Sequence, residues 1–467
     1  MKIYDSRQKQ KLDFIPIVKG KVRMYVCGPT VYDDAHLGHA RSSIVFDLLA
    51  RVLQVSGYEV KFVKNFTDID DKIIKKALEL GKSVKEVSSY YINSYLNDME
   101  ALLVKRPDIE PKATESLESI IKMITILLDK KIAYKTSNGD IYLSVDKDNL
   151  YGSISHRGGK DDENISRVGE NTAKEGERDF ALWKAYKGEG DIGYETSLGM
   201  GRPGWHIECS AMIESILAYE GMSHKIDIHG GGADLAFPHH ENEASQTRCA
   251  SGIEIAKYWM HNGFVNINGE KMSKSLGNSF FVKDALKIYD GEVLRNYLLG
   301  VHYRSVLNFN EEDLMVSKKR LDKIYRLKKR AMGETNQVDE NFKMNFLEAM
   351  SDDLNISKAF SVLEEMISAC NEMIDKDPKN KSIKGKVMGN IEFISSILGI
   401  GGGDPIRYFQ LGVSEEQKIK IAHKLKDRDI AKKEKNFILA DSIRDELAKD
   451  GIAIMDTQSG SVWEKIN

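Results

Sequence analysis

Two histidines, His36 and His39, flank a Leu-Gly pair just ahead of a run of apolar residues that repeats every four positions. A spacing of three places both rings on one face at the start of a helix. The first turn of a helix offers unpaired N–H groups and a positive dipole, so it binds anions. Gly38 has no side chain, which lets a phosphate or a flat base approach the backbone. The pattern indicates an anion site, although a polar helix cap would explain the same residues.

Lys271 and Lys274 stand three apart in the string Lys-Met-Ser-Lys-Ser, far downstream in the chain. Two ammonium groups among hydroxyls and glycines suit a loop that folds over a polyphosphate, because lysine is a point charge that can follow charge as it develops. Taken alone, the string would also be explained by a solvated charged loop.

Sulfur, imidazole and carboxylate donors occur at Cys27, Cys209, His239 and Glu243. The last two are four apart and follow a proline, so they share one face of a helix turn. All four are competent zinc ligands. The chain has no Cys-x-x-Cys pair and no His-Glu-x-x-His string, so neither a zinc finger nor a metalloprotease is indicated. Spacing alone leaves two interpretations open: a zinc site, or two separate buried cysteines with a His–Glu pair at a helix start.

The elements that must position these residues alternate between strands and helices over the first part of the chain. We expect strands at 24–27 and 58–66, and helices at 40–55 and 68–80. Such alternation predicts a parallel sheet with crossover helices. Ligands of these folds bind at the carboxyl ends of the strands, which is where His36 falls.

Further along the chain the composition and the hydrophobic periodicity change. Residues 156–179 are mostly polar and glycine, and we interpret them as a mobile surface excursion within an insertion. Beyond residue 310 long helical periods predict a separate bundle. Residues 414–450 are charged and helical, and a short tail that forms a small strand or two follows them.

The amino-acid composition excludes several classes of protein. The chain has 467 residues, of which 41% are hydrophobic and 30% charged, with a net charge of −3. This excludes collagen-like, disordered and disulfide-scaffold proteins. Four irregularly spaced cysteines suit a reducing cytosol. We expect neither a transmembrane helix nor a secretory signal, since no sufficiently long apolar run occurs.

Two strings, His-Leu-Gly-His at 36–39 and Lys-Met-Ser-Lys-Ser at 271–275, are called the ATP-type strings here. In a parallel α/β context they resemble the signature of class I aminoacyl-tRNA synthetases, in which both elements bind ATP on a Rossmann-type fold. The segments around Cys27, around Cys209 and at 227–243 resemble the cysteinyl-tRNA synthetase family more closely. Further matching strings lie at 65–72, 179–184 and 202–206, so the resemblance covers most of the chain.

The resemblance implies a set of roles for residues of this chain. The zinc ligands, one ion per chain, would be Cys27, Cys209, His239 and Glu243. The cysteine pocket would hold Gly28, Thr67, Trp205, His229 and Asp234. The ATP site would hold His36, Gly38, His39 and Lys274, with His36 and His39 at the phosphates, and with Lys271 and Lys274 at the departing pyrophosphate. The contacts to tRNA would include Arg428 and Trp463, whose chemistry suits unpaired bases.

The resemblance also implies partners and an organisation. It implies an α/β catalytic domain split by an insertion, then a helical bundle and a small anticodon-binding domain. It also implies a cytoplasmic monomer whose partners are ATP with Mg²⁺, L-cysteine and tRNA(Cys). We expect half of the catalytic domain at 1–115, a connective insertion at 116–200, the second half at 201–265, the signature-loop and stem-contact region at 266–310, the bundle at 311–400 and the C-terminal domain at 405–467.

Zinc in such a pocket would have a physical purpose. Cysteine differs from serine by one atom, and an ordinary pocket separates such pairs by only about 1–3 kcal/mol. A zinc ion binds thiolate well and lowers the pKa of the thiol, whereas a serine hydroxyl is much harder to ionise. Four protein ligands normally close a zinc site. The substrate sulfur must then be a fifth ligand or displace a weak one, for which Glu243 is the candidate.

Two rival functions stay open. A ligase that joins cysteine to an amino sugar resembles this chain at all the motifs, but it lacks the full anticodon-binding end that residues 414–467 provide. A non-catalytic RNA-binding paralogue is the other, and the intact histidine and lysine strings argue against it. The stretch 318–330, with eight Lys or Arg in 13 residues, is either a solvated helix face or a contact to the tRNA backbone.

Overall fold

The computed structural model describes residues 1–157, 174–267, 270–271, 280–333, 335–457 and 460–465. The chain divides into two compact units, which are considered separately: Met1–Met315 with Met344–Val362, and Val316–Lys343 with Leu363–Asn467.

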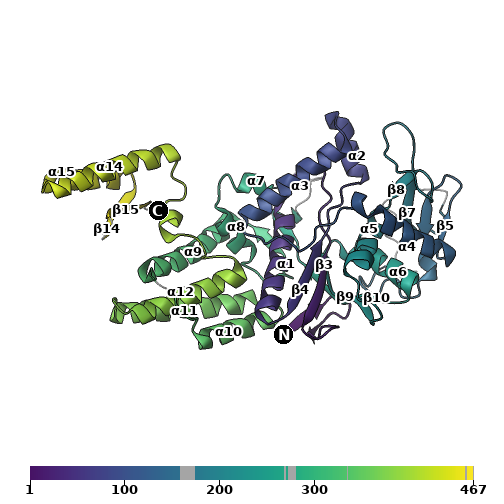
Figure 1. The fold of residues 1–467 in the computed structure, drawn as a ribbon, viewed down its shortest axis with the longest axis horizontal. Helices are drawn as coiled ribbons and strands as arrows, with labels where there is room; N and C mark the ends of the chain where they lie inside the picture. The colour runs from purple at the N-terminus through teal and green to yellow at the C-terminus, as the bar shows by residue number, and fades with distance from the viewer. Residues whose placement is uncertain (158–173, 268–269, 272–279, 334, 458–459, 466–467) are drawn as a thin grey trace. The chain divides into compact units, whose positions relative to one another are not determined.

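A four-stranded parallel sheet lies at the centre of the first unit (Figure 1). Its strands, in spatial order, are β10 (Glu254–Asn262), β9 (His224–Gly232), β3 (Lys21–Val26) and β4 (Glu59–Lys64). The middle strands are largely buried, as a parallel sheet covered on both faces requires. The predicted parallel α/β architecture is confirmed. A separate antiparallel pair, β1 (Lys2–Asp5) and β2 (Gln10–Asp13), precedes it.

Three helices follow the first two sheet strands: α1 (Leu37–Val55), α2 (Asp71–Leu80) and α3 (Val84–Ala101). The helix expected from Asp68 begins later, because Asp70 caps it by accepting from the Lys72 N–H at 2.9 Å. Asp68 instead binds the Thr114 N–H and hydroxyl. The carboxylates therefore have different structural roles, and Asp71 forms ion pairs with Lys184 and Arg202.

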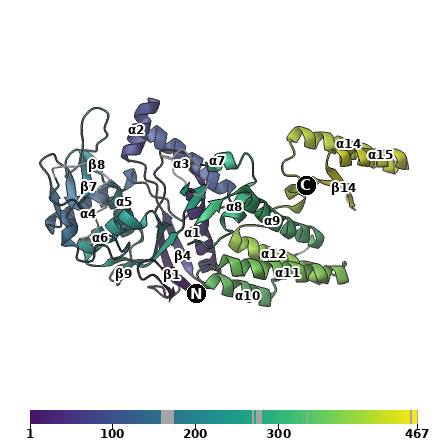
Figure 2. The ribbon, with the colours of Figure 1, turned by 180° about the vertical axis from the view of Figure 1, so that it is seen from behind.

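An antiparallel sheet, which falls between β4 and β9 in the chain, lies with three helices beside the parallel sheet (Figures 1 and 2). Its strands, in order, are β5 (Ala133–Lys135), β6 (Ile141–Leu143), β7 (Phe180–Ala185) and β8 (Gly201–Pro203). The helices are α4 (Leu117–Asp129), α5 (Trp205–Met212) and α6 (Glu241–Ser251). They share one apolar core with the strands. Most of the excursion expected at 156–179 lies outside the described residues.

The remaining elements of the first unit follow β10. They are β11 (Val265–Ile267), β12 (Glu270–Lys271), α7 (Val282–Ala285), α8 (Gly291–Leu298) and β13 (Leu307–Phe309).

Helices dominate the rest of the chain, as predicted beyond residue 310. They are α9 (Glu311–Ala331), α10 (Glu340–Ser351), α11 (Ile356–Lys376), α12 (Lys381–Leu398), α13 (Pro405–Tyr408), α14 (Glu415–Lys433) and α15 (Phe437–Lys449), followed by the hairpin of β14 (Ile452–Thr457) and β15 (Gly460–Lys465). Within the described part of the chain, none of the helices has the length and apolar character needed to cross a membrane.

Candidate active site

His36 and His39 form the N-terminal cap of α1. Nδ1 of His36 accepts the Gly38 N–H at 3.0 Å and the His39 N–H at 3.3 Å, and the two rings stack with centroids 3.8 Å apart. A Cβ on Gly38 would lie 2.8 Å from the His36 ring, so this arrangement requires glycine. The helix expected from Ala40 begins at Leu37, because this capping satisfies the backbone N–H groups one turn earlier.

The four predicted zinc ligands converge at the carboxyl end of β3. Their donor atoms all lie within 4.8 Å of one another, and all four side chains are buried. The Sγ atoms of Cys27 and Cys209 are 3.7 Å apart. Oε1 of Glu243 lies 3.3 Å from the Cys27 Sγ and 3.0 Å from Nε2 of His239. Two thiols, an imidazole and a carboxylate form a donor set that zinc uses in proteins.

The electrostatics of this cluster also fit a divalent cation. Burial raises the pKa of the Cys27 thiol well above its usual range, and the hydrogen bond with Cys209 adds to that effect. Burial lowers the pKa of His239 to about 3, so its ring is neutral and keeps a lone pair for a metal. A bound metal ion would stabilise the charged form of these buried thiols.

Two aromatic side chains, Trp205 and His206, hold the ring of His239 in place. Trp205 stacks on its ring with centroids 4.2 Å apart. Nδ1 of His206 lies 3.0 Å from Nδ1 of His239, which leaves Nε2 facing Glu243 and Cys209. In a metal-binding histidine the second ring nitrogen is normally hydrogen-bonded, because that bond orients the ring.

Glu243 is bridged to the parallel sheet by His229. Nε2 of His229 lies 2.8 Å from Oε2 of Glu243, and its ring stacks on Trp259 at 4.7 Å. Burial alone would raise the pKa of Glu243, but the nearby His229 and His239 rings lower it. The carboxylate therefore has one oxygen beside the thiol and the other held by a histidine.

Aromatic side chains lie behind the predicted ligand set, and sequence reasoning missed two of them, Trp259 and His261. Nδ1 of His240 lies 2.8 Å from Nε2 of His261, and the His240 ring has its centroid 4.5 Å from that of His229 and 5.4 Å from that of Trp259. The string Tyr-Trp-Met-His in β10 carries two of these side chains. The string alone did not indicate that these side chains lie near the predicted ligands. That follows only from the strand order, which places β10 beside β9.

The other residues expected in the cysteine pocket lie around the same strand ends. The Gly28 N–H donates to Oδ1 of Asn65 at 2.8 Å, and a Cβ on Gly28 would fall 1.6 Å from the Asn65 carbonyl oxygen. Only glycine fits there. The Thr67 hydroxyl donates to Oε2 of Glu208, at 3.2 Å. Asp234 lies in the turn that follows β9. The assignment of these residues to substrate stays a prediction.

Only Lys271 of the Lys-Met-Ser-Lys-Ser string belongs to the described residues. Lys271 lies in β12, where it pairs in register with Asn266 of β11. Lys274 is outside the described residues, so its predicted position at ATP is not described.

The expected tRNA contacts lie in the interior of the second unit. Trp463 belongs to a small apolar core with Leu425 and Leu447. Arg428 is 3% exposed and pairs with Asp456 at 2.6 Å. In the free chain both side chains are engaged in intramolecular contacts, and their contact with tRNA stays a prediction.

Several cations of the basic stretch 318–330 are also engaged within the second unit. Lys328 donates to the carbonyl oxygens of Gly401, Gly402 and Gly403 at 2.7–3.0 Å. Lys329 pairs with Glu464 at 2.8 Å. For these two lysines the contacts support a structural role rather than a contact to the tRNA backbone.

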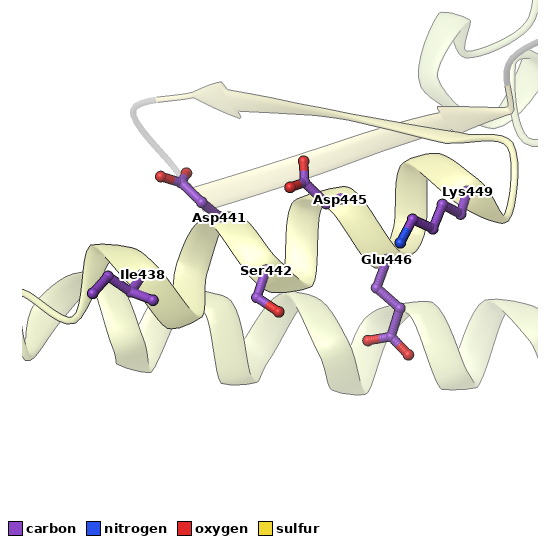
Figure 3. Close-up of a pocket in the computed structure, with 6 residues that line it drawn as sticks. All are labelled: Ile438, Asp441, Ser442, Asp445, Glu446 and Lys449. Carbon is purple, nitrogen blue, oxygen red and sulfur yellow. The ribbon is translucent and has the colours of Figure 1, made fainter.

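A shallow concavity runs along α15 (Figure 3). It is lined by Ile438, Asp441, Ser442, Asp445, Glu446 and Lys449. Three carboxylates against one lysine disfavour a phosphate there. At the start of the same helix Phe437 is 61% exposed, so it presents an aromatic face to solvent.

Comparisons with known proteins identify the family of this chain. The tRNA synthetases class I (C) catalytic domain model matches residues 13–319, and the DALR domain model matches residues 345–400. Cysteine--tRNA ligase of Helicobacter pylori (strain ATCC 700392 / 26695) is 63% identical over 465 residues, and that of Wolinella succinogenes is 60% identical over 466 residues. The first match covers 100% of both chains, and the second covers 100% of this chain and 99% of the relative.

Solved structures share the fold at low identity. Methionyl-tRNA synthetase of Mycobacterium tuberculosis, in complex with methionyl-adenylate, superposes with a TM-score of 0.59 and 13% identity, over 85% of this chain and 95% of that chain. The LeuRS of Agrobacterium radiobacter K84, in its ternary complex with tRNA and LeuAMS, gives 0.60 and 11%, over 87% of each chain. The chain therefore belongs to the class I aminoacyl-tRNA synthetases and, among them, to the cysteine–tRNA ligase family.

Proposed function

We propose that this cysteine–tRNA ligase selects its amino acid with a zinc ion held by Cys27, Cys209, His239 and Glu243. The observation that carries the proposal is the convergence of these four buried donors at the carboxyl end of β3. Zinc bound there would offer a coordination position that accepts a thiolate and discriminates against a hydroxyl. His229 holds one oxygen of Glu243, which supports Glu243 as the ligand that gives way.

The residues of the chain act on ATP mainly by positioning and by charge. The carboxylate of bound cysteine attacks the α-phosphate of ATP, and pyrophosphate leaves. His36 and His39, at the positive end of α1, face the phosphates in this proposal. Lys271 and Lys274 balance the charge that develops on the departing pyrophosphate. Magnesium accompanies ATP.

The acyl group then passes to the terminal ribose of tRNA(Cys). We place unpaired bases of the tRNA at the C-terminal part of the second unit. The predicted contacts are Arg428 and Trp463, and the exposed ring of Phe437 adds a surface on which a base can stack. The proposed form is a monomer in the cytoplasm, where cysteine thiols stay reduced.

Cysteine-dependent ATP–pyrophosphate exchange tests the activating chemistry. The purified chain is assayed with cysteine and, as the control, with serine, and zinc is measured on the same sample. Exchange with cysteine alone, at about one zinc per chain, is the expected result. Absence of exchange from a folded, zinc-loaded sample would contradict the proposal and favour a non-catalytic RNA-binding paralogue.

The acceptor is tested by aminoacylation of tRNA(Cys). The relatives named cysteine--tRNA ligase match the chain over its whole length, C-terminal helices included, which argues against an amino-sugar acceptor. Transfer of cysteine to tRNA is the expected result, and transfer to an amino sugar alone would overturn the assignment.

A further inference from the structure

The chain that leads into α1 runs beside the chain that follows the Lys-Met-Ser-Lys-Ser string. The Leu37 N–H donates to the Phe280 carbonyl at 3.2 Å, and the Val282 N–H donates to the Ala35 carbonyl at 2.8 Å. The residues between them pair as an antiparallel bridge. Residues 272–279 lie outside the described residues, so the pairing concerns only the stretch after them. Backbone hydrogen bonds thus join the flanks of both ATP-type strings.

One ion pair stands directly beside this backbone pairing. Lys283, at the start of α7, donates to Oδ2 of Asp34 at 2.5 Å. The other oxygen, Oδ1, accepts from the Ser94 hydroxyl of α3 at 2.7 Å. The Asp34 side chain is only 8% exposed, whereas that of Lys283 is 44% exposed. The carboxylate is therefore held in place by α3, and the lysine approaches it from the solvent side.

Lys283 also lies in a corner rich in carboxylates. Asp98 of α3 lies close by, and its Oδ2 atom is buried with no hydrogen-bond partner in the described part of the chain. Burial, and after it the charge of Asp34, raises the pKa of Asp98 to about 7, while Lys283 opposes that shift. Asp284 adds a further negative charge. The positive charge of Lys283 therefore opposes the repulsion between these carboxylates.

We propose that Asp34 and Lys283 are positioning residues for adenylate formation. Their ion pair holds the stretch 280–282 against 35–37, and so sets the position of His36 relative to the chain that leaves the lysine string. The inference rests on the proposed function, because that function places ATP at His36 and His39. A half-exposed ion pair contributes little to folding stability. A large kinetic effect would therefore report positioning rather than loss of the fold.

Exchange kinetics on the full-length chain test the pair. Lys283→Met and Asp34→Asn are compared with the double variant, and ATP and cysteine are varied separately. We expect each single variant to lower kcat/KM for ATP by about tenfold or more, with the KM for cysteine and the zinc content unchanged. The double variant should lose no more than the worse single one, because both remove the same interaction. Lys283→Arg should restore most of the activity.

Lys287→Met is the matched control. Lys287 pairs with Asp284 at 2.7 Å beside the same helix, in an exposed position, so its loss should leave the exchange kinetics unchanged. Wild-type kinetics in Lys283→Met would overturn the inference, even if Asp34→Asn fails to fold. Additive losses in the double variant, or no recovery with arginine, would also overturn it. No cysteine-dependent exchange in the unmodified chain would instead overturn the proposed function, and the inference with it.

Discussion

Cys209 lies buried between Cys27 and His239, where exchanging its sulfur for oxygen changes the side-chain volume little but removes one of the proposed zinc ligands. We predict that Cys209→Ser lowers the zinc content from about one ion per chain to a small fraction and abolishes cysteine-dependent exchange. Elemental analysis and the exchange assay check both effects. Cys249→Ser, outside the ligand set, should change neither. Retained zinc with normal activation would refute the ligand assignment.

The Asp98 carboxyl makes folding stability depend on pH. Its pKa is raised by burial and by the charge of Asp34, from 3.8 to about 7. Below pH 4 both the folded and the unfolded chain carry this proton. Between pH 4 and 7 only the folded chain keeps it, so the contribution to stability falls as pH rises and is lost above about 7.

We therefore predict that Asp98→Asn raises Tm at pH 8 by about 2 °C or more, and changes it less at pH 5. Thermal unfolding at the two pH values measures this difference. Glu79→Gln, on the exposed face of α2, serves as the control. Equal effects of Asp98→Asn at both pH values would contradict the prediction.

At the start of α1, one side chain has a structural role and a proposed chemical role. His36 caps the helix through Nδ1, and the proposed function also places ATP phosphates at His36. Asparagine is a good N-cap, whereas alanine at the same position lowers the free energy of unfolding by about 1 kcal/mol. The two substitutions therefore separate capping from catalysis.

We predict that His36→Asn keeps the free energy of unfolding within about 0.5 kcal/mol of wild type, whereas His36→Ala loses about 1 kcal/mol. Both should lower kcat/KM for ATP by about 100-fold, because neither supplies the imidazole. Urea unfolding and exchange kinetics measure the two effects. Full exchange activity in His36→Asn would show that His36 acts only as a helix cap.

Helix α9 illustrates how packing decides the role of a charged stretch. Its string of lysines and arginines predicted equally a solvated face or a surface for tRNA. Lys328 instead donates to three consecutive carbonyl oxygens in the glycine turn after α12 and is 8% exposed. No periodicity in the sequence could reveal that partner, because the turn lies about 70 residues away along the chain and reaches α9 only through the fold of the bundle.

The division into two units predicts that amino-acid activation and tRNA binding can be impaired separately. Phe437→Ala removes an exposed ring of the second unit. We predict that it raises the KM for tRNA about fivefold or more, since stacking on one base contributes about 1–3 kcal/mol. Exchange without tRNA should stay at the wild-type rate. Ile419→Ala, an exposed apolar residue of α14, is the control, and an unchanged KM for tRNA in Phe437→Ala would exclude the stacking role.

Much of this molecule could be predicted from local pattern. The apolar repeat that became α1, the alternation of strands and helices, and the helical texture beyond residue 310 all depend on neighbours in sequence, and the structure confirms them. The donor types at Cys27, Cys209, His239 and Glu243 were equally visible, because sulfur, imidazole and carboxylate groups are recognisable as metal ligands wherever they occur. Their spacing alone did not say that they meet.

Tertiary structure decided which of these groups lie together. Strand order places β9 between β3 and β10, which brings His229 and the aromatic residues of β10 behind the ligand set. Packing put Trp463 and Arg428 in the interior of the second unit and paired Asp34 with Lys283, far apart in the sequence. The physical reason is the same in each case. Secondary structure follows from short-range backbone and side-chain preferences, whereas convergence depends on burying apolar faces of distant segments against one another.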